Sequence, residues 1–89
     1  MNAPLSQPLN AEMYTELITS MAMQTLPYGA LSGLQVYQTN SLLSATANID
    51  GERHSLPLAI AGGTMEDFAY NLRMYLKVIR RNLDIKAMY

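Results

Sequence analysis

Residues 34–58 read LQVYQTNSLLSATANIDGERHSLPL, and this stretch decides the fold. Within it, the dipeptide Asp50-Gly51 lies between two runs in which apolar and polar residues alternate. A two-residue hairpin turn of type I′ needs positive φ at both central positions, and Asp-Gly tolerates that conformation. The pattern therefore predicts an antiparallel hairpin in which Ile49 lies opposite Glu52.

The register of the hairpin follows from this turn. Counting outward, Ala47 is expected opposite His54, Ala45 opposite Leu56, and Leu43 opposite Leu58. A second two-residue turn at Asn40-Ser41 would place Val36 opposite Ala45 and Leu34 opposite Ala47. The apolar residues of three strands then share one face, as a half-buried sheet requires. The opposite face is expected to be solvated, and it comprises Gln35, Tyr37, Thr39, Ser44, Thr46, Asn48, Arg53 and Ser55.

The two edges of this meander differ. Pro57 cannot donate to a ladder and is therefore expected on an edge strand, which supports the strand order 1-2-3. The other edge has no charge, proline or glycine to block pairing with another chain. It is the candidate homodimer edge, and it consists of Leu34, Gln35, Val36, Tyr37, Gln38 and Thr39.

One helix is expected before the meander in the chain and another after it. Asn10 can cap a helix over residues 11–25, whose apolar positions recur with helical spacing, and Pro27 ends it. Thr64 begins a second helix at residue 65 with acids in its first turn. Its buried stripe is expected to comprise Phe68, Leu72, Tyr75, Leu76, Ile79 and Leu83. The helix could stop near Asn82 or continue to Met88, and in the longer case part of it would overhang the sheet.

These elements predict an α+β fold, a two-layer α-β-β-β-α domain over residues 10–89, preceded by a flexible arm over residues 1–9. Eighty-nine residues leave no room for a second core. Only 15% of residues are charged, against about 25% in ordinary globular proteins, which suggests a surface partly covered by protein. Residues 1–63 carry a net charge of −3 and residues 64–89 a net charge of +2.

Composition narrows the possible functions. Cysteine is absent and His54 is the single histidine, so neither a disulfide framework nor a thiolate metal site is available. We expect no metal and no cofactor. The chain begins without a secretory signal and has no apolar run of about 20 residues, so we expect a cytoplasmic protein without a membrane span. Along a strand Asp50 lies about 13 Å from His54 and Ser55 points to the opposite face, so no catalytic triad forms locally and His54 is expected to be a polar rim residue near the hairpin.

The back of the second helix carries the candidate partner-binding residues. Basic and aromatic groups alternate opposite the buried stripe, a composition found at protein interfaces and also at phosphate-binding surfaces. A plain solvated helix face is the competing interpretation. The candidate residues are Tyr70, Arg73, Met74, Lys77 and Arg81, with Arg80 flanking them.

The element order, read over residues 11–83, is similar to the layout of double-stranded RNA-binding domains. That family binds through lysines at the start of its second helix and a basic or histidine-bearing loop between its first two strands. Here these places hold Thr64-Met65-Glu66-Asp67 and Thr39-Asn40-Ser41. The resemblance therefore implies shared topology only, which carries no function by itself.

Together, these features favour a small non-enzymatic interaction protein, dimeric, acting as an adaptor, regulator or inhibitor of a larger protein. Small binders of this kind are common among phage and mobile-element products, and the sequence leaves that origin open. The alternative is a nucleic-acid-binding module that uses Arg73, Lys77, Arg80 and Arg81. It would bind with an affinity that falls steeply as salt is added.

Overall fold

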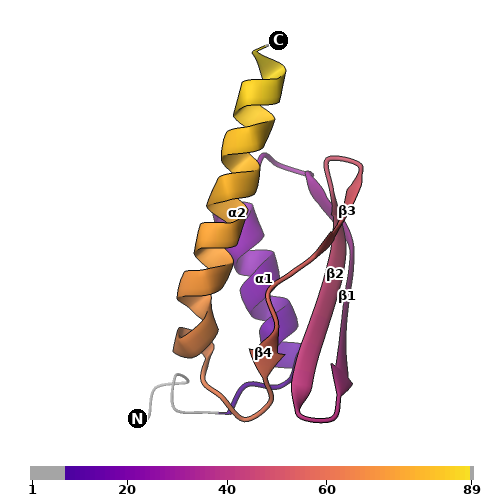
Figure 1. Cartoon of the computed structure of the whole chain (residues 1–89), viewed down its shortest axis with the longest axis vertical. Coiled ribbons are helices and arrows are strands. Elements are labelled where there is room, and N and C mark those ends of the chain that lie inside the picture. Colours follow the sequence, from indigo (N-terminus) through magenta and orange to yellow (C-terminus); the bar gives the residue numbers. More distant parts are fainter. Residues whose placement is uncertain (1–7, 89) are drawn as a thin grey trace.

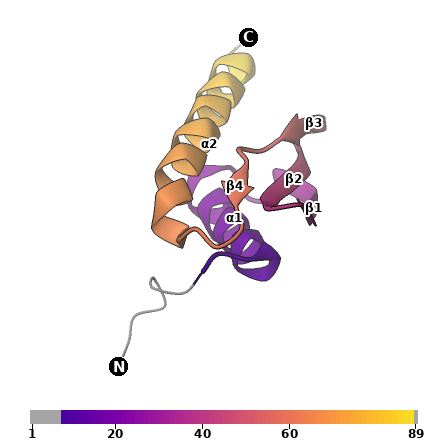
Figure 2. The same ribbon diagram turned by 60° about the horizontal axis from the view of Figure 1, so that its bottom comes forward.

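The computed structural model describes residues 8–88 and has the predicted α+β architecture (Figure 1). Both helices lie on the same side of an antiparallel sheet, which leaves the opposite face of the sheet uncovered (Figure 2). In chain order the elements are α1 (Ala11–Thr25), β1 (Leu31–Thr39), β2 (Leu42–Ile49), β3 (Glu52–Ser55), β4 (Ala59–Ile60) and α2 (Met65–Ala87). The strand order β1-β2-β3 confirms the meander, with β4 as a second segment that pairs with β2.

α1 has the predicted bounds. The side-chain oxygen of Asn10 accepts a hydrogen bond of 2.9 Å from the Met13 backbone N–H, so one of the unpaired amides of the first turn is satisfied. Leu26 is extended and precedes Pro27, which cannot continue the helix. The predicted apolar face is buried, and it comprises Tyr14, Leu17, Ile18, Met21 and Ala22.

The turns of the meander form as expected. Asp50 and Gly51 both have positive φ, 53° and 85°, and Ile49 pairs with Glu52 and Ala47 with His54. At the other turn Asn40 has positive φ (57°), and Val36 pairs with Ala45. The two turns therefore set the register of the sheet beside them.

The register shifts once in β1, at Gly33. Ser32 pairs with Asn48 and Gln35 with Thr46, so Gly33 and Leu34 together lie opposite Ala47. Gly33 has φ 61°, a conformation that glycine adopts without the steric cost of a Cβ. The expected pairing of Leu34 with Ala47 is thus replaced by a bulge, which adds one residue to the edge strand.

The expected pairing of Leu43 with Leu58 is wrong. Leu43 lies opposite Ala59 and Leu42 opposite Ile60, one residue out of step with the β2–β3 pairing. The Leu56 N–H still donates to the Ala45 carbonyl at 2.9 Å, and the chain leaves the ladder at Pro57, which has no N–H to donate, so the third strand is split into β3 and β4. Since alternate residues point to opposite faces, this one-residue shift buries Ala59 and exposes Leu58.

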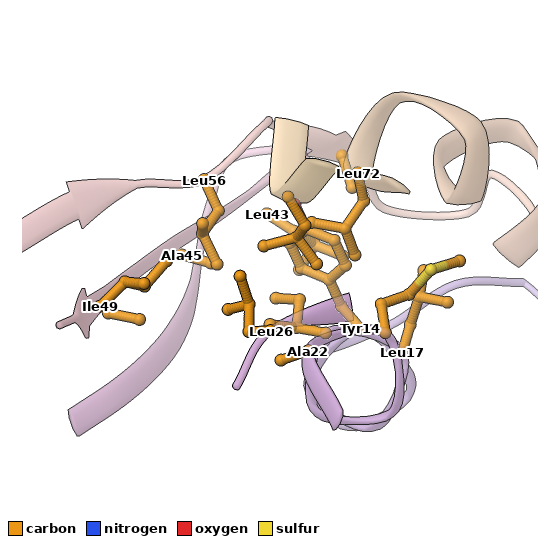
Figure 3. Packing of buried hydrophobic residues seen from close by; sticks show 14 of the residues in the cluster. Tyr14, Leu17, Ala22, Leu26, Leu43, Ala45, Ile49, Leu56 and Leu72 are labelled. Carbon is orange, nitrogen blue, oxygen red and sulfur yellow. The ribbon is translucent and has the colours of Figure 1, made fainter. Parts of the chain in front are cut away.

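The core lies between the sheet and the two helices. Figure 3 shows Tyr14 of α1, Leu43 of β2 and Leu72 of α2 pointing toward one another, and all three are at most 1% exposed. The hydroxyl of Tyr14 donates a hydrogen bond to the backbone carbonyl of Pro57. The largest core side chain thus contacts the point at which the third strand is interrupted.

α2 continues through Ala87, with Met88 as its C-cap, so the longer of the two expected helices forms. Its N-terminus is fixed at Thr64, whose backbone N–H donates to Asp67 Oδ2 at 3.1 Å. Of the predicted stripe, Leu72, Leu76 and Ile79 are buried, and the other three residues are partly buried against the core. The last turns of α2 extend beyond the other elements (Figure 1).

Leu9 begins the packed part of the described chain. It is 1% exposed, its backbone N–H donates to the Gly63 carbonyl, and its carbonyl accepts from Gly62 N–H at 3.0 Å. The sequence places Leu9 in the arm, but these contacts make it part of the core. The rest of the expected arm, apart from the exposed Pro8, lies outside the described residues.

Candidate interaction surfaces

α2 presents all five candidate partner-binding residues to solvent. Tyr70 is 65% and Met74 44% exposed, and Arg73, Lys77 and Arg81 are exposed as well. None of the five belongs to the core that α2 forms with α1 and the sheet. The structure therefore brings the predicted residues together on one accessible helix face.

Two further apolar residues, which the sequence analysis missed, extend this face. Val78 is 56% and Ile85 44% exposed. At 3.6 residues per turn, Tyr70, Met74, Val78 and Ile85 lie within about 80° of one another around the helix, opposite the buried residues. We call these four residues the outer stripe. Their spacing of four and seven residues is visible in the sequence and could have identified it.

Three cations lie on one flank of the outer stripe, together with one exposed acid, Asp84, which is paired with Arg80. Arg73, Lys77 and Arg81 form no salt bridge with another side chain of residues 8–88. The opposite flank carries the neutral Asn71 and Asn82, both exposed. The face therefore combines an exposed apolar row with positive charge on one side.

Arg80 has a different role from the one the sequence suggested. Its Nη1 donates to the Thr25 carbonyl at 3.1 Å, and its Nε donates to Asp84 Oδ1 at 3.0 Å. α1 has no basic residue in its own last turn, so Arg80 of α2 satisfies one of the terminal carbonyls of α1. This arginine holds the two helices together and is thereby withdrawn from the candidate binding face.

The candidate dimer edge is one of the two edges of the sheet. β1 pairs with β2 on one side and with no other strand of the described chain on the other. Gln35, Tyr37, Gln38 and Thr39 are exposed, whereas Leu34 and Val36 are partly buried against the core. The bulge of Gly33 and Leu34 includes the first residue of this segment, and the pairing with β2 is regular from Gln35 onward.

The uncovered face of the sheet is less polar than expected. Leu58 and Ile60 are each 55% exposed because of the shift at Pro57, and Leu42, opposite Ile60, is 41% exposed. Tyr37 of β1 is also exposed on this face, at 48%. The polar part of the face is held by Arg53, whose guanidinium donates to Gln35 Oε1 at 3.1 Å and to Thr46 Oγ1 at 2.7 Å.

A groove runs between the C-terminal half of α2 and the β2–β3 hairpin. Two adjoining hollows, of about 160 and 510 Å³, are lined in common by Asp50, Leu83 and Lys86. His54 lies at this groove, where its Nδ1 is 3.0 Å from the Tyr75 hydroxyl and its Nε2 is 3.9 Å from Glu52 Oε1. Burial raises the pKa of Tyr75. His54 thus joins β3 to α2, near the hairpin as expected.

Within residues 8–88, no group of three or more histidine, cysteine, aspartate or glutamate side chains is arranged to hold a metal ion. Over the same residues, neither helix combines the length and the apolar character that crossing a bilayer would need. No family model, curated protein or solved structure matches this chain.

Proposed function

We propose that this protein is a small non-enzymatic interaction module that pairs with a second copy and binds a larger protein as its adaptor, regulator or inhibitor. The observation that carries the proposal is the outer face of α2. Four large apolar residues are exposed there in one row, beside three cations that have no acidic partner in the described chain. Exposed aromatic and methionine side chains with arginine are the composition of protein interfaces.

The free edge of β1 supports the pairing with a second copy. An exposed edge strand presents unpaired N–H and C=O groups that can extend the sheet of another molecule. Residues 34–39 carry no charge that would oppose such pairing. Two copies joined at this edge would form one continuous sheet and leave the outer face of α2 free on each copy.

The proposal is tested by affinity capture from the native host with the full-length chain as bait. The wild type should retain a specific protein that the Tyr70→Glu/Lys77→Glu variant loses. Lys86→Glu is the matched control, because it changes the same charge on the same helix nine positions from Lys77, half a turn around. A wild type that stays monomeric at high micromolar concentration and retains no protein would refute the proposal.

The cations of α2 also support an alternative, a nucleic-acid-binding module. Arg73, Lys77 and Arg81 remain available for phosphates, whereas Arg80 is engaged with Thr25 and Asp84. Three phosphate contacts to duplex DNA would give a logarithmic salt slope of about −2.7. Titration of the protein against labelled duplex DNA and RNA at low salt decides the matter, since the absence of binding to both removes this alternative.

A further inference from the structure

We propose that the segment of the partner that binds the outer stripe is an acidic amphipathic helix. This inference rests on the proposed function and adds the chemistry of the occupant. The stripe runs from Tyr70 to Ile85, about 23 Å along the helix axis at 1.5 Å per residue. A partner helix of about 16 residues would match that length.

The shape of the outer stripe suits a helix. Tyr70, Met74 and Val78 are four residues apart and form a ridge of the kind that packs into the groove of a second helix. All three are exposed, and Ile85 continues the row five residues past Arg80, which contacts Thr25, the last residue of α1. A helix presenting apolar residues at similar spacing would bury this row along its whole length.

The charge beside the outer stripe selects an acidic partner. Arg73, Lys77 and Arg81 lie on the same flank within about 80° of helix rotation, and none has an acidic partner among residues 8–88. A helix with carboxylates along one flank would neutralise all three while its apolar face covers the row. Such complementarity raises the rate of association and disfavours basic competitors.

A second copy of α2 does not supply this complementarity. In an antiparallel pairing centred near Val78, the cationic flank of one helix would face the cationic flank of the other. In a parallel pairing it would face the neutral residues Asn71 and Asn82. The antiparallel pairing brings one carboxylate near Arg73, that of Asp84, which is already paired with Arg80, and the parallel pairing brings none. The charge therefore favours a different chain over a second copy.

The positions of the apolar and charged residues on the outer face of α2 also favour a protein partner over a nucleic acid or a membrane. The apolar row occupies the centre of the face and the cations one side of it. Duplex DNA would bury Val78 and Ile85 against phosphate and ribose. Burial of apolar side chains against such polar groups contributes little binding free energy. Binding to an anionic membrane would bring the polar Asn71 and Asn82 to the lipid surface, because the apolar row beside them is only about 80° wide.

The test is a selection of helical peptides of about 16 residues, with randomised surface positions, on the full-length protein. We expect the selected peptides to carry an apolar row with Asp and Glu on one flank. Their affinity should fall at least tenfold for Lys77→Glu/Arg81→Glu and for Met74→Gln/Val78→Gln. It should be unchanged for Lys86→Glu, and circular dichroism should show that every variant keeps its helices.

Several results would overturn this inference. One is a selected pool without acidic enrichment, or peptides whose binding is insensitive to both double substitutions. Others are tighter binding to duplex DNA or to vesicles containing phosphatidylserine, and a dimer that Met74→Gln/Val78→Gln dissociates. If a host protein is captured through Tyr70 while no acidic peptide binds, the interaction module stands and the acidic helix is rejected.

Discussion

The hydroxyl of Tyr14, on the first helix, donates a hydrogen bond to the carbonyl of Pro57, at the break between β3 and β4. Forty-three positions separate the two residues. The carbonyl belongs to a segment that has left the ladder with β2, so the side chain of a helix supplies the contact that a neighbouring strand would otherwise make. The interruption of the sheet is thus held in place by the core.

Tyr14→Phe should destabilise the protein by about 1–2 kcal/mol, because it removes the donor and leaves a partly buried carbonyl without its partner. Urea unfolding followed by circular dichroism measures the change. Tyr28→Phe is the matched control, since Tyr28 is fully exposed and its substitution should leave the midpoint unchanged. Equal midpoints for Tyr14→Phe and the wild type would show that the hydrogen bond contributes nothing.

Alkaline pH should unfold the protein through the same residue. Burial raises the pKa of Tyr14 to about 12, from an ordinary value of 10.0. Because the folded-state pKa is the higher one, this contribution to stability is complete below pH 10 and is lost as the pH rises toward 12. Burial of Tyr75 acts in the same direction. The fall in unfolding free energy over this range should be smaller in Tyr14→Phe, and an identical fall would contradict the assignment.

The shift at Pro57 gives Leu56 and Leu58 opposite environments, with exposures of 3% and 55%. Leu56→Ala should therefore cost about 2–5 kcal/mol, whereas Leu58→Ala should stay within about 0.5 kcal/mol of the wild type. Denaturant unfolding of the two variants, which differ only in position, makes the comparison direct. Similar large losses for both would mean that the register of the β2–β3 hairpin continues unbroken to Leu43 and Leu58.

Gln38→Pro should dissociate the proposed dimer without unfolding the monomer. In a two-residue hairpin Thr39 and Leu42 form the hydrogen-bonded pair, so the N–H of Gln38, one residue earlier, points away from β2. Proline there removes a donor of the free edge while keeping the β1–β2 ladder. Sedimentation velocity should show a dimer for the wild type and a monomer for the variant. A dimer that survives the substitution would place the interface elsewhere.

The rules for helix caps and hairpin turns predicted the fold correctly next to each cap and turn, and less well farther along the chain. Asn10, Asp50-Gly51 and Thr64 each fix neighbouring backbone, so α1, the hairpin and the start of α2 appear at their predicted positions. The predicted register is wrong beyond Gly33 and beyond Pro57, the two residues in these strands that can interrupt a ladder. Each inserts one residue, and neither the sequence pattern nor the turns reveal on which side of the break pairing resumes.

The candidate surface was predictable to a similar degree. Exposure of Tyr70 and its neighbours follows from helical periodicity, because they lie opposite the buried row. Val78 and Ile85 have the same periodicity but are aliphatic, whereas the predicted candidates are basic, aromatic or methionine, the residue types typical of interfaces. The contact of Arg80 with Thr25 depends on how α2 packs against α1, which involves residues 55 positions apart and has no local signature.

The contacts of Leu9 bear on the order in which the chain folds. Its two main-chain hydrogen bonds reach Gly62 and Gly63, across a loop that contains α1 and the whole meander. Closing so long a loop carries an entropic cost that is recovered only once the intervening segments are in place. We expect this closure to form after the transition state, so that Leu9→Ala accelerates unfolding in stopped-flow measurements and leaves the folding rate unchanged. Detachment of Leu9 would then be among the first steps by which the native protein opens.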